Sequence, residues 1–253
     1  MVPLISITIP TYVLIATIGA IIAALFLYLR AEKYEIGFST LLIYAAVSGI
    51  TLLIGSKIVF AIGSIPLMEN GITFMKILRR FISGGIVFYG GMLGFIGGVF
   101  ILSRIRKDNS FTMLNFFAPA IPLFHAFGRL GCFFGGCCYG VEASWGFPMA
   151  ADIFVSRFPV QLAESLCNVI IFIVICNAEK KKASDANLLL IYLFMYSVCR
   201  FILEFFRGDK ERGLWGAVST SQIISIVVFL TCSAFCIIKA MKKGRKISDG
   251  AQI

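Results

Sequence analysis

The sequence predicts an all-α polytopic membrane protein, because it is unusually apolar and its apolar residues come in long runs. Hydrophobic residues make up 59% of the 253-residue chain and charged residues only 14%, whereas about 25% charged residues are typical of a soluble domain. The mean hydropathy is +0.93. A helix that crosses a bilayer needs about 20 apolar residues. We therefore predict seven transmembrane helices in a single membrane domain over residues 1–253, at residues 11–29, 39–62, 84–103, 112–133, 160–176, 187–205 and 216–238.

Basic residues between the predicted helices indicate the orientation. The loops on the side of Arg30 and of the C-terminal tail hold more lysine and arginine than the opposite loops. Because basic loops stay in the cytoplasm, we expect the N-terminus outside, the C-terminus in the cytoplasm, and loops 63–83 and 134–158 facing outward. The first of these outward loops contains an amphipathic segment around Arg79 that is typical of an interfacial helix.

The net charge of +10 does not indicate a nucleic-acid partner in a chain of this composition. It is explained by the basic loops and by anionic lipid headgroups beside them. No basic region precedes the first apolar run, so we expect no cleaved signal peptide. We therefore expect the partner of these basic residues to be the membrane and not a nucleic acid.

Arg200 lies well inside the sixth predicted helix, where an arginine costs roughly 2.5–3.5 kcal/mol and marks a candidate functional site. Helical spacing places Tyr196, Arg200, Glu204 and Arg207 on one face. A structural interpretation is an Arg–Glu pair that joins two helices. However, one glutamate cannot neutralise both arginines, which favours a bound anion.

Arg129 lies in the stretch HAFGRLGCFFGGCCYG, residues 125–140, with the only histidine of the chain, His125, four residues earlier. Arg129 has no acidic residue three or four positions away. An unpaired guanidinium can bind two phosphate oxygens at once; alternatively, Arg129 extends to the outer interface. We expect the glycines of this stretch to unwind the helix end so that Arg129 reaches a phosphate.

Glycines are also frequent in the third predicted helix. Gly90, Gly94 and Gly98 follow the small-xxx-small spacing that allows close helix packing. The doublet Gly90–Gly91 beside Tyr89 favours a second interpretation, a local unwinding that turns backbone amides toward a ligand.

The eight cysteines show no CxxC pair and no histidine at zinc-finger spacing, so we predict no metal site and no cofactor. Cysteines within apolar runs are expected to pack as small hydrophobic residues. For Cys132, Cys137 and Cys138 three interpretations stay open: structural thiols, a disulfide that includes Cys132, or thiols with a chemical role. A disulfide between the adjacent Cys137 and Cys138 would be strained.

These motifs resemble the prolipoprotein diacylglyceryl transferase family over most of the chain. The family signature G-R-x-G-N-F-x-N-x-E-x-x-G resembles GRLGCFFGGCCYG, which keeps Gly128, Arg129, Gly131, Phe133 and Gly140. H-P-S-Q-L-Y-E resembles FPVQLAE, which keeps Pro159, Gln161, Leu162 and Glu164. R-F-x-x-E-F-F-R is present as RFILEFFR, from Arg200 to Arg207. W-Y-G-L resembles TYVL with Tyr12, and H-G-G-L-I-G resembles YGGMLG with Gly90 and Gly91.

The resemblance implies an enzyme of lipoprotein biosynthesis in the bacterial cytoplasmic membrane, with its active site toward the outer leaflet. It would move a diacylglyceryl group from phosphatidylglycerol to the lipobox cysteine thiol beside a prolipoprotein signal peptide, so that a thioether forms and glycerol phosphate leaves. Arginines would stabilise the anionic leaving group. The implied catalytic residues are Arg129, Arg200, Glu204, His125 and Tyr89. The implied substrate-binding residues are Tyr12, Gly90, Gly91, Gly131, Cys132, Cys137, Gly140, Gln161, Glu164 and Arg207.

Several positions depart from the family pattern. Cys132 and Gly135 stand where the signature has asparagine, Cys137 stands where it has glutamate, and Tyr89 replaces a histidine regarded as the catalytic base. His125, one turn from Arg129, is either a replacement base or a hydrogen-bonding residue. The departures favour an alternative, a related lipid-alkyl transferase with another acceptor. A third class, a lipid or solute transporter, is disfavoured because the chain shows no inverted repeat of broken helices.

Overall fold

The computed structural model describes residues 10–63, 73–83, 87–149, 152–180, 187–208, 214–215 and 218–250. Within these ranges, seven helical segments are long and apolar enough to cross a membrane. The predicted all-α polytopic fold is therefore confirmed. The segments are Thr11–Tyr34, Phe38–Ile62, Phe88–Arg106, Ser110–Phe134, Val160–Lys180, Leu188–Phe206 and Thr220–Lys239.

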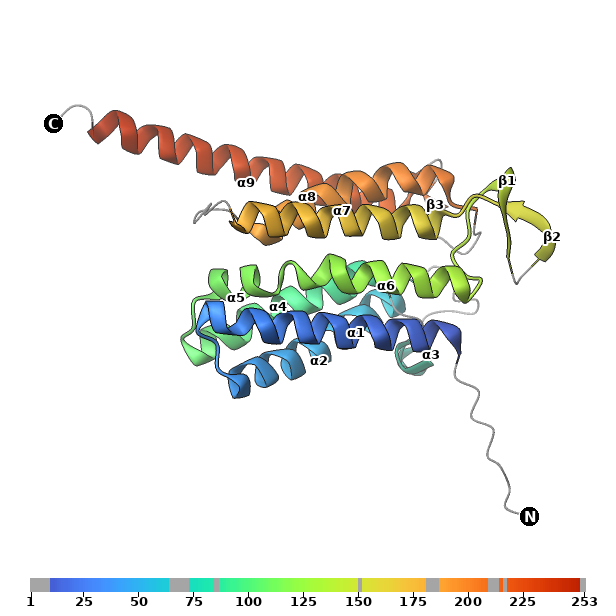
Figure 1. The fold of residues 1–253 in the computed structure, drawn as a ribbon, viewed down its shortest axis with the longest axis horizontal. Coiled ribbons are helices and arrows are strands. Elements are labelled where there is room, and N and C mark those ends of the chain that lie inside the picture. The colour runs from blue at the N-terminus through green and yellow to red at the C-terminus, as the bar shows by residue number, and fades with distance from the viewer. Residues whose placement is uncertain are drawn as a thin grey trace, which may run out of the picture. The chain divides into compact units, whose positions relative to one another are not determined.

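The secondary structure is mainly helical, with two short antiparallel strand pairs (Figure 1). The helices are α1 (Thr11–Ala31), α2 (Phe38–Gly63), α3 (Phe74–Ser83), α4 (Phe88–Arg106), α5 (Ser110–Phe117), α6 (Ala120–Phe134), α7 (Val160–Lys180), α8 (Leu188–Leu203) and α9 (Thr220–Gly250). The strands are β1 (Glu142–Met149), β2 (Asp152–Arg157), β3 (Leu214–Trp215) and β4 (Val218–Ser219).

The chain forms two compact units. One is Leu25–Phe117, and the other combines Met1–Ala24 with Ala118–Ile253. The single membrane domain expected from the sequence stays a prediction.

In the unit Leu25–Phe117, α2 packs closely against α4 through glycines, as the small-xxx-small spacing predicts. A Cβ atom at Gly90 would lie 2.7 Å from Val59 Cβ, and one at Gly94 would overlap the backbone carbonyl of Thr51. Helix α4 is continuous from Phe88 to Arg106. The predicted unwinding at the Gly90–Gly91 doublet is therefore wrong: these glycines serve helix packing.

We expect Gly94→Ala to lower the free energy of unfolding by about 1–3 kcal/mol, because the added methyl meets backbone that cannot move without separating the helices. Gly97→Ala is a matched control, since a Cβ there would have no neighbour within 4 Å. Thermal unfolding of both variants in detergent measures the difference. Equal melting temperatures would contradict the close α2–α4 contact.

Arg30 is buried at the end of α1, with 8% of its surface exposed. Its Nε donates to the carbonyl of Phe116 at 3.1 Å, and its guanidinium donates to the Tyr34 hydroxyl at 2.8 Å. It thereby satisfies a carbonyl in the last turn of α5 that has no partner within that helix. Counting Arg30 among the loop residues is therefore wrong, because it lies buried in the last turn of α1.

In the other unit, α7 lies beside α6 and α8, and α8 lies beside α9 (Figure 1).

The fourth predicted helix, residues 112–133, is in fact two helices, α5 and α6. The chain turns at Ala118–Pro119 between them, where a proline has no N–H to continue a helical hydrogen-bond ladder.

The predicted outward loop 134–158 contains the antiparallel pair β1–β2. Gly140, just before β1, forms an isolated backbone bridge with Arg207. Arg207 has extended backbone and follows the short 3₁₀ turn Glu204–Phe206 after α8. A Cβ at Gly140 would overlap the carbonyl of Phe158 and lie 2.9 Å from that of Phe206. Only glycine fits where these three backbone segments meet. The predicted part of Gly140 in substrate binding stays a prediction.

Candidate active site

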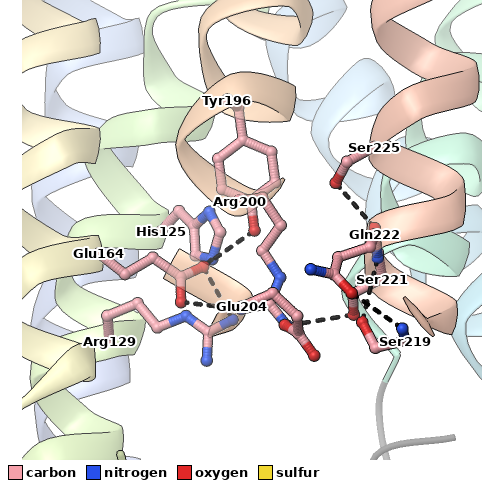
Figure 2. A network of polar contacts seen from close by, with 10 residues as sticks. All are labelled: His125, Arg129, Glu164, Tyr196, Arg200, Glu204, Ser219, Ser221, Gln222 and Ser225. Atoms are coloured by element: carbon pink, nitrogen blue, oxygen red, sulfur yellow. Dashed lines mark hydrogen bonds and ion pairs between the residues drawn. The ribbon is translucent and has the colours of Figure 1, made fainter. Parts of the chain in front are cut away.

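Glu164 of α7 is a buried carboxylate shared by residues of two neighbouring helices, α6 and α8 (Figure 2). Its Oε1 lies 3.0 Å from an Arg129 guanidinium nitrogen and accepts a 2.9 Å hydrogen bond from the Tyr196 hydroxyl. Its Oε2 lies 3.4 Å from Arg200. Only 2% of Glu164 is exposed. The expectation that Arg129 is unpaired is therefore wrong, because its acidic partner comes from another helix.

Arg200 of α8 contacts two further groups. One guanidinium nitrogen lies 2.6 Å from Glu204 Oε2, four residues later, and the same nitrogen donates to Ser221 Oγ at 3.1 Å. The Arg–Glu pair on one helix face is as predicted. However, Glu164 and Glu204 together balance the formal charges of Arg129 and Arg200. The sequence-based count compared Glu204 with Arg200 and Arg207 and did not include Glu164 or Arg129. With Arg207 counted, three arginines face two glutamates, and the bound anion stays a prediction.

Arg129 is the more accessible of the two arginines. Its side chain is 12% exposed, against 4% for Arg200. Its buried Nε has no hydrogen-bond partner among the described residues. A guanidinium has five N–H donors, so Arg129 can hold Glu164 and still donate to an incoming anion.

His125 lies inside the same cluster. Its Nε2 is 3.7 Å from Glu164 Oε1, and its ring centroid is 5.1 Å from that of Tyr196. It is 7% exposed. The structure therefore places His125 beside the carboxylate, at a distance longer than a direct hydrogen bond.

Three thiols converge at the C-terminal end of α6, Cys132 from its last turn and Cys137 and Cys138 from the segment that follows. The sulfur atoms of Cys132, Cys137 and Cys138 lie within 4.8 Å of one another. Cys132 is buried, Cys137 is exposed, and all three are free thiols in this structure. Hydrogen bonds from the thiols of Cys132 and Cys137, with smaller contributions from nearby arginines, lower the pKa of the Cys138 thiol.

A reversal of the chain after α6 brings the thiols together. Gly136 and Cys138 have φ angles of 70° and 56°, the left-handed region that glycine adopts readily and other residues rarely. Helix α6 itself continues to Phe134. The prediction that glycines unwind the helix at Arg129 is therefore wrong, and Arg129 projects from an intact helix.

Gln161 and Tyr12 lie next to this thiol cluster. Gln161 is buried, and its amide nitrogen donates to the Cys137 carbonyl at 2.7 Å. Its Oε1 has no hydrogen-bond partner among the described residues. Tyr12 packs on α6, because a Cβ at Gly131 would lie 3.1 Å from Tyr12 Cδ2. Gln161, which holds the Cys137 carbonyl, is thus about one turn of α7 away from Glu164.

Within the unit Met1–Ala24 plus Ala118–Ile253, most residues predicted for the site occur together. They are Tyr12, His125, Arg129, Gly131, Cys132, Cys137, Gly140, Gln161, Glu164, Arg200, Glu204 and Arg207. Tyr89, Gly90 and Gly91 belong to Leu25–Phe117, where they begin α4 and are buried. Their part in the site stays a prediction.

Sequence reasoning placed Tyr196 on the helix face of Arg200 without assigning it a role, and it missed the start of α9 as part of the site. Ser219 and Gln222 form a reciprocal cap: the Ser219 amide donates to Gln222 Oε1 at 2.9 Å, and the Gln222 amide donates to Ser219 Oγ at 3.2 Å. The Ser-x-x-Gln spacing is a recognised helix-start signal, so this cap was visible in the sequence. It fixes Ser221 opposite Arg200 (Figure 2).

Comparison with known proteins identifies the family of this chain. The sequence matches the family described as prolipoprotein diacylglyceryl transferase over residues 1–238. A Clostridium perfringens protein named phosphatidylglycerol–prolipoprotein diacylglyceryl transferase 2 is 30% identical over 74% of this chain and 73% of the relative. A Clostridium tetani phosphatidylglycerol–prolipoprotein diacylglyceryl transferase is 28% identical over 84% of this chain and 86% of the relative. The chain belongs to the prolipoprotein diacylglyceryl transferase family.

Proposed function

We propose that this protein transfers the diacylglyceryl group of phosphatidylglycerol to the lipobox cysteine thiol of a prolipoprotein. The acceptor sulfur bonds to the terminal glyceryl carbon, the bond from that carbon to phosphate oxygen breaks, and glycerol phosphate leaves. The thiol proton is released in the same reaction. The observation that carries the proposal is Arg129, a buried arginine with an unused Nε in a network of charged side chains.

The network suits stabilisation of a leaving phosphate. Negative charge builds up on the phosphate oxygen as the bond to carbon breaks, and fixed donors in a dry site stabilise that charge more than water would. Arg129 binds the phosphate directly. Arg200, held by Glu164, Glu204 and Ser221, fixes the position of Glu164 and adds positive charge.

We further propose that the site opens toward the outer leaflet of a bacterial cytoplasmic membrane, with the N-terminus outside and the C-terminus in the cytoplasm. The distribution of basic loop residues supports this orientation. The acceptor is the segment of the prolipoprotein that includes the end of its signal peptide. It approaches from the β1–β2 side, where Cys137 is exposed.

His125 serves to position Glu164 rather than to remove the thiol proton. We expect His125→Gln to retain activity within about threefold, because glutamine keeps a hydrogen-bonding group there, whereas loss of a general base costs about 10²–10⁴ in rate. Initial rates across a pH series measure this. A loss greater than 100-fold, with the pH dependence removed, would identify His125 as the base instead.

A second candidate function keeps the lipid donor but changes the acceptor. Cys132, Gly135 and Cys137 replace polar residues of the family pattern, and they lie where the acceptor would approach. If this alternative holds, the protein consumes phosphatidylglycerol without modifying a lipobox cysteine.

Complementation separates the two candidates. Cells depleted of their own diacylglyceryl transferase are supplied with this protein, and a lipoprotein peptide is examined by mass spectrometry. The proposed function predicts restored growth and a diacylglyceryl group on the cysteine. Lipid turnover without that adduct supports the second candidate, and absence of both contradicts transferase activity.

A further inference from the structure

We propose that Cys132, Cys137 and Cys138 form a binding site for a soft divalent metal ion, zinc in the first place. The proposal that this ion activates the acceptor thiol rests on the transferase function above; the metal site itself does not. It departs from the sequence-based expectation of no metal, which considered only spacing along the chain.

The geometry of the three sulfur atoms fits such an ion. Zinc binds thiolate at about 2.3 Å, so two sulfurs of a tetrahedral site are separated by roughly 3.8 Å. The three sulfurs here lie within 4.8 Å of one another. Small side-chain rotations bring them onto one ion, and soft thiolate ligands favour zinc over magnesium or calcium.

The backbone around the thiols holds them in place. The left-handed conformations of Gly136 and Cys138 reverse the chain so that Cys137 and Cys138 return toward Cys132. The Cys137 amide donates to the Cys132 carbonyl at 3.1 Å, and Gln161 holds the Cys137 carbonyl at 2.7 Å. Groups that fix the positions of the ligands in this way are typical of metal centres.

Three protein ligands leave the fourth position of a tetrahedral ion open, which distinguishes catalytic from structural zinc sites. Cys137 is exposed, so a further ligand could reach an ion held by the three thiols. Gln161, whose Nε2 holds the Cys137 carbonyl, also has a buried Oε1 with no hydrogen-bond partner among the described residues.

The location fits a role in thiol activation. Cys132 lies three residues after Arg129 on α6, and Gln161 lies three residues before Glu164 on α7. The thiol cluster is thus about one helical turn from the phosphate site. A thiol that binds the ion loses its proton to solvent. The bound sulfur then attacks the glyceryl carbon, and glycerol phosphate leaves with the electron pair of the broken bond.

Zinc binding to the purified full-length protein tests the site without reference to activity. Under reducing conditions with added zinc alone, we expect about one ion per chain. Cys137→Ser, an exposed position, should fold normally and weaken binding by at least about 100-fold, since even supporting groups contribute 10–100-fold. Cys236→Ser, at another exposed free cysteine, is the matched control and should bind normally. Equal zinc binding by both variants, or none by the unsubstituted protein, overturns the proposal.

Activity measurements separate this inference from the proposed function. Removal of zinc by a chelator should abolish diacylglyceryl transfer, and re-addition of zinc should restore it. Transfer that persists in demonstrably zinc-free protein refutes thiol activation but leaves the transferase function standing. Stoichiometric zinc binding without any transfer refutes the function but leaves the metal site standing.

Discussion

Glu164→Gln is expected to lower the free energy of unfolding by about 3–5 kcal/mol and to abolish transfer. Glutamine keeps the shape of the side chain but removes the charge that Arg129 and Arg200 share. Removing one partner of a buried ion pair leaves an uncompensated buried charge, which carries a cost of this size. Thermal unfolding in detergent, together with an initial-rate assay, measures both effects.

Glu142→Gln is the matched control. The Glu142 carboxylate lies 3.8 Å from Arg157, but its side chain is 73% exposed, and exposed ion pairs contribute only about 0–1 kcal/mol. We expect its stability and activity to remain near those of the unsubstituted protein. If Glu164→Gln proves equally harmless, Glu164 does not hold the network together.

Arg129→Lys is expected to reduce kcat/KM by about 10²–10³ while the protein stays folded. Lysine preserves the positive charge beside Glu164, but it lacks the planar set of donors that binds two phosphate oxygens. Loss of one donor to a developing oxyanion typically costs this much. Initial rates at several phosphatidylglycerol concentrations, with melting temperatures alongside, measure the effect.

Arg106→Lys provides the comparison. Arg106 forms an ion pair with Asp108 at 3.1 Å, where both side chains are about one-third exposed, and we place it outside the catalytic machinery. The transfer activity of the Arg106→Lys variant should be unchanged. Retention of full activity by Arg129→Lys would show that a simple positive charge is sufficient at this position.

The overall fold was predictable from the sequence because bilayer thickness sets the length of an apolar helix. Seven spans were expected and seven occur among the described residues. The division of residues 112–133 into α5 and α6 was missed. Composition marks this segment as a span, and the prediction did not use Pro119, whose missing N–H marks the interruption in the sequence itself.

The candidate site was predictable only where its contacts are local. The Arg200–Glu204 pair follows from helical spacing. The Arg129–Glu164 pair joins α6 and α7, so no window of sequence around Arg129 contains its partner. Likewise, the thiols of Cys132, Cys137 and Cys138 lack the spacing of a zinc finger, yet a left-handed turn gathers them.

The central claim is that this protein joins a diacylglyceryl group to a cysteine sulfur. The direct measurement incubates purified protein with phosphatidylglycerol and a synthetic prolipoprotein peptide that contains a lipobox cysteine, followed by mass spectrometry. The claim predicts one diacylglyceryl group on that cysteine, equimolar glycerol phosphate, and no product with a serine-substituted peptide. An unmodified cysteine peptide alongside folded, lipid-bound protein would contradict it.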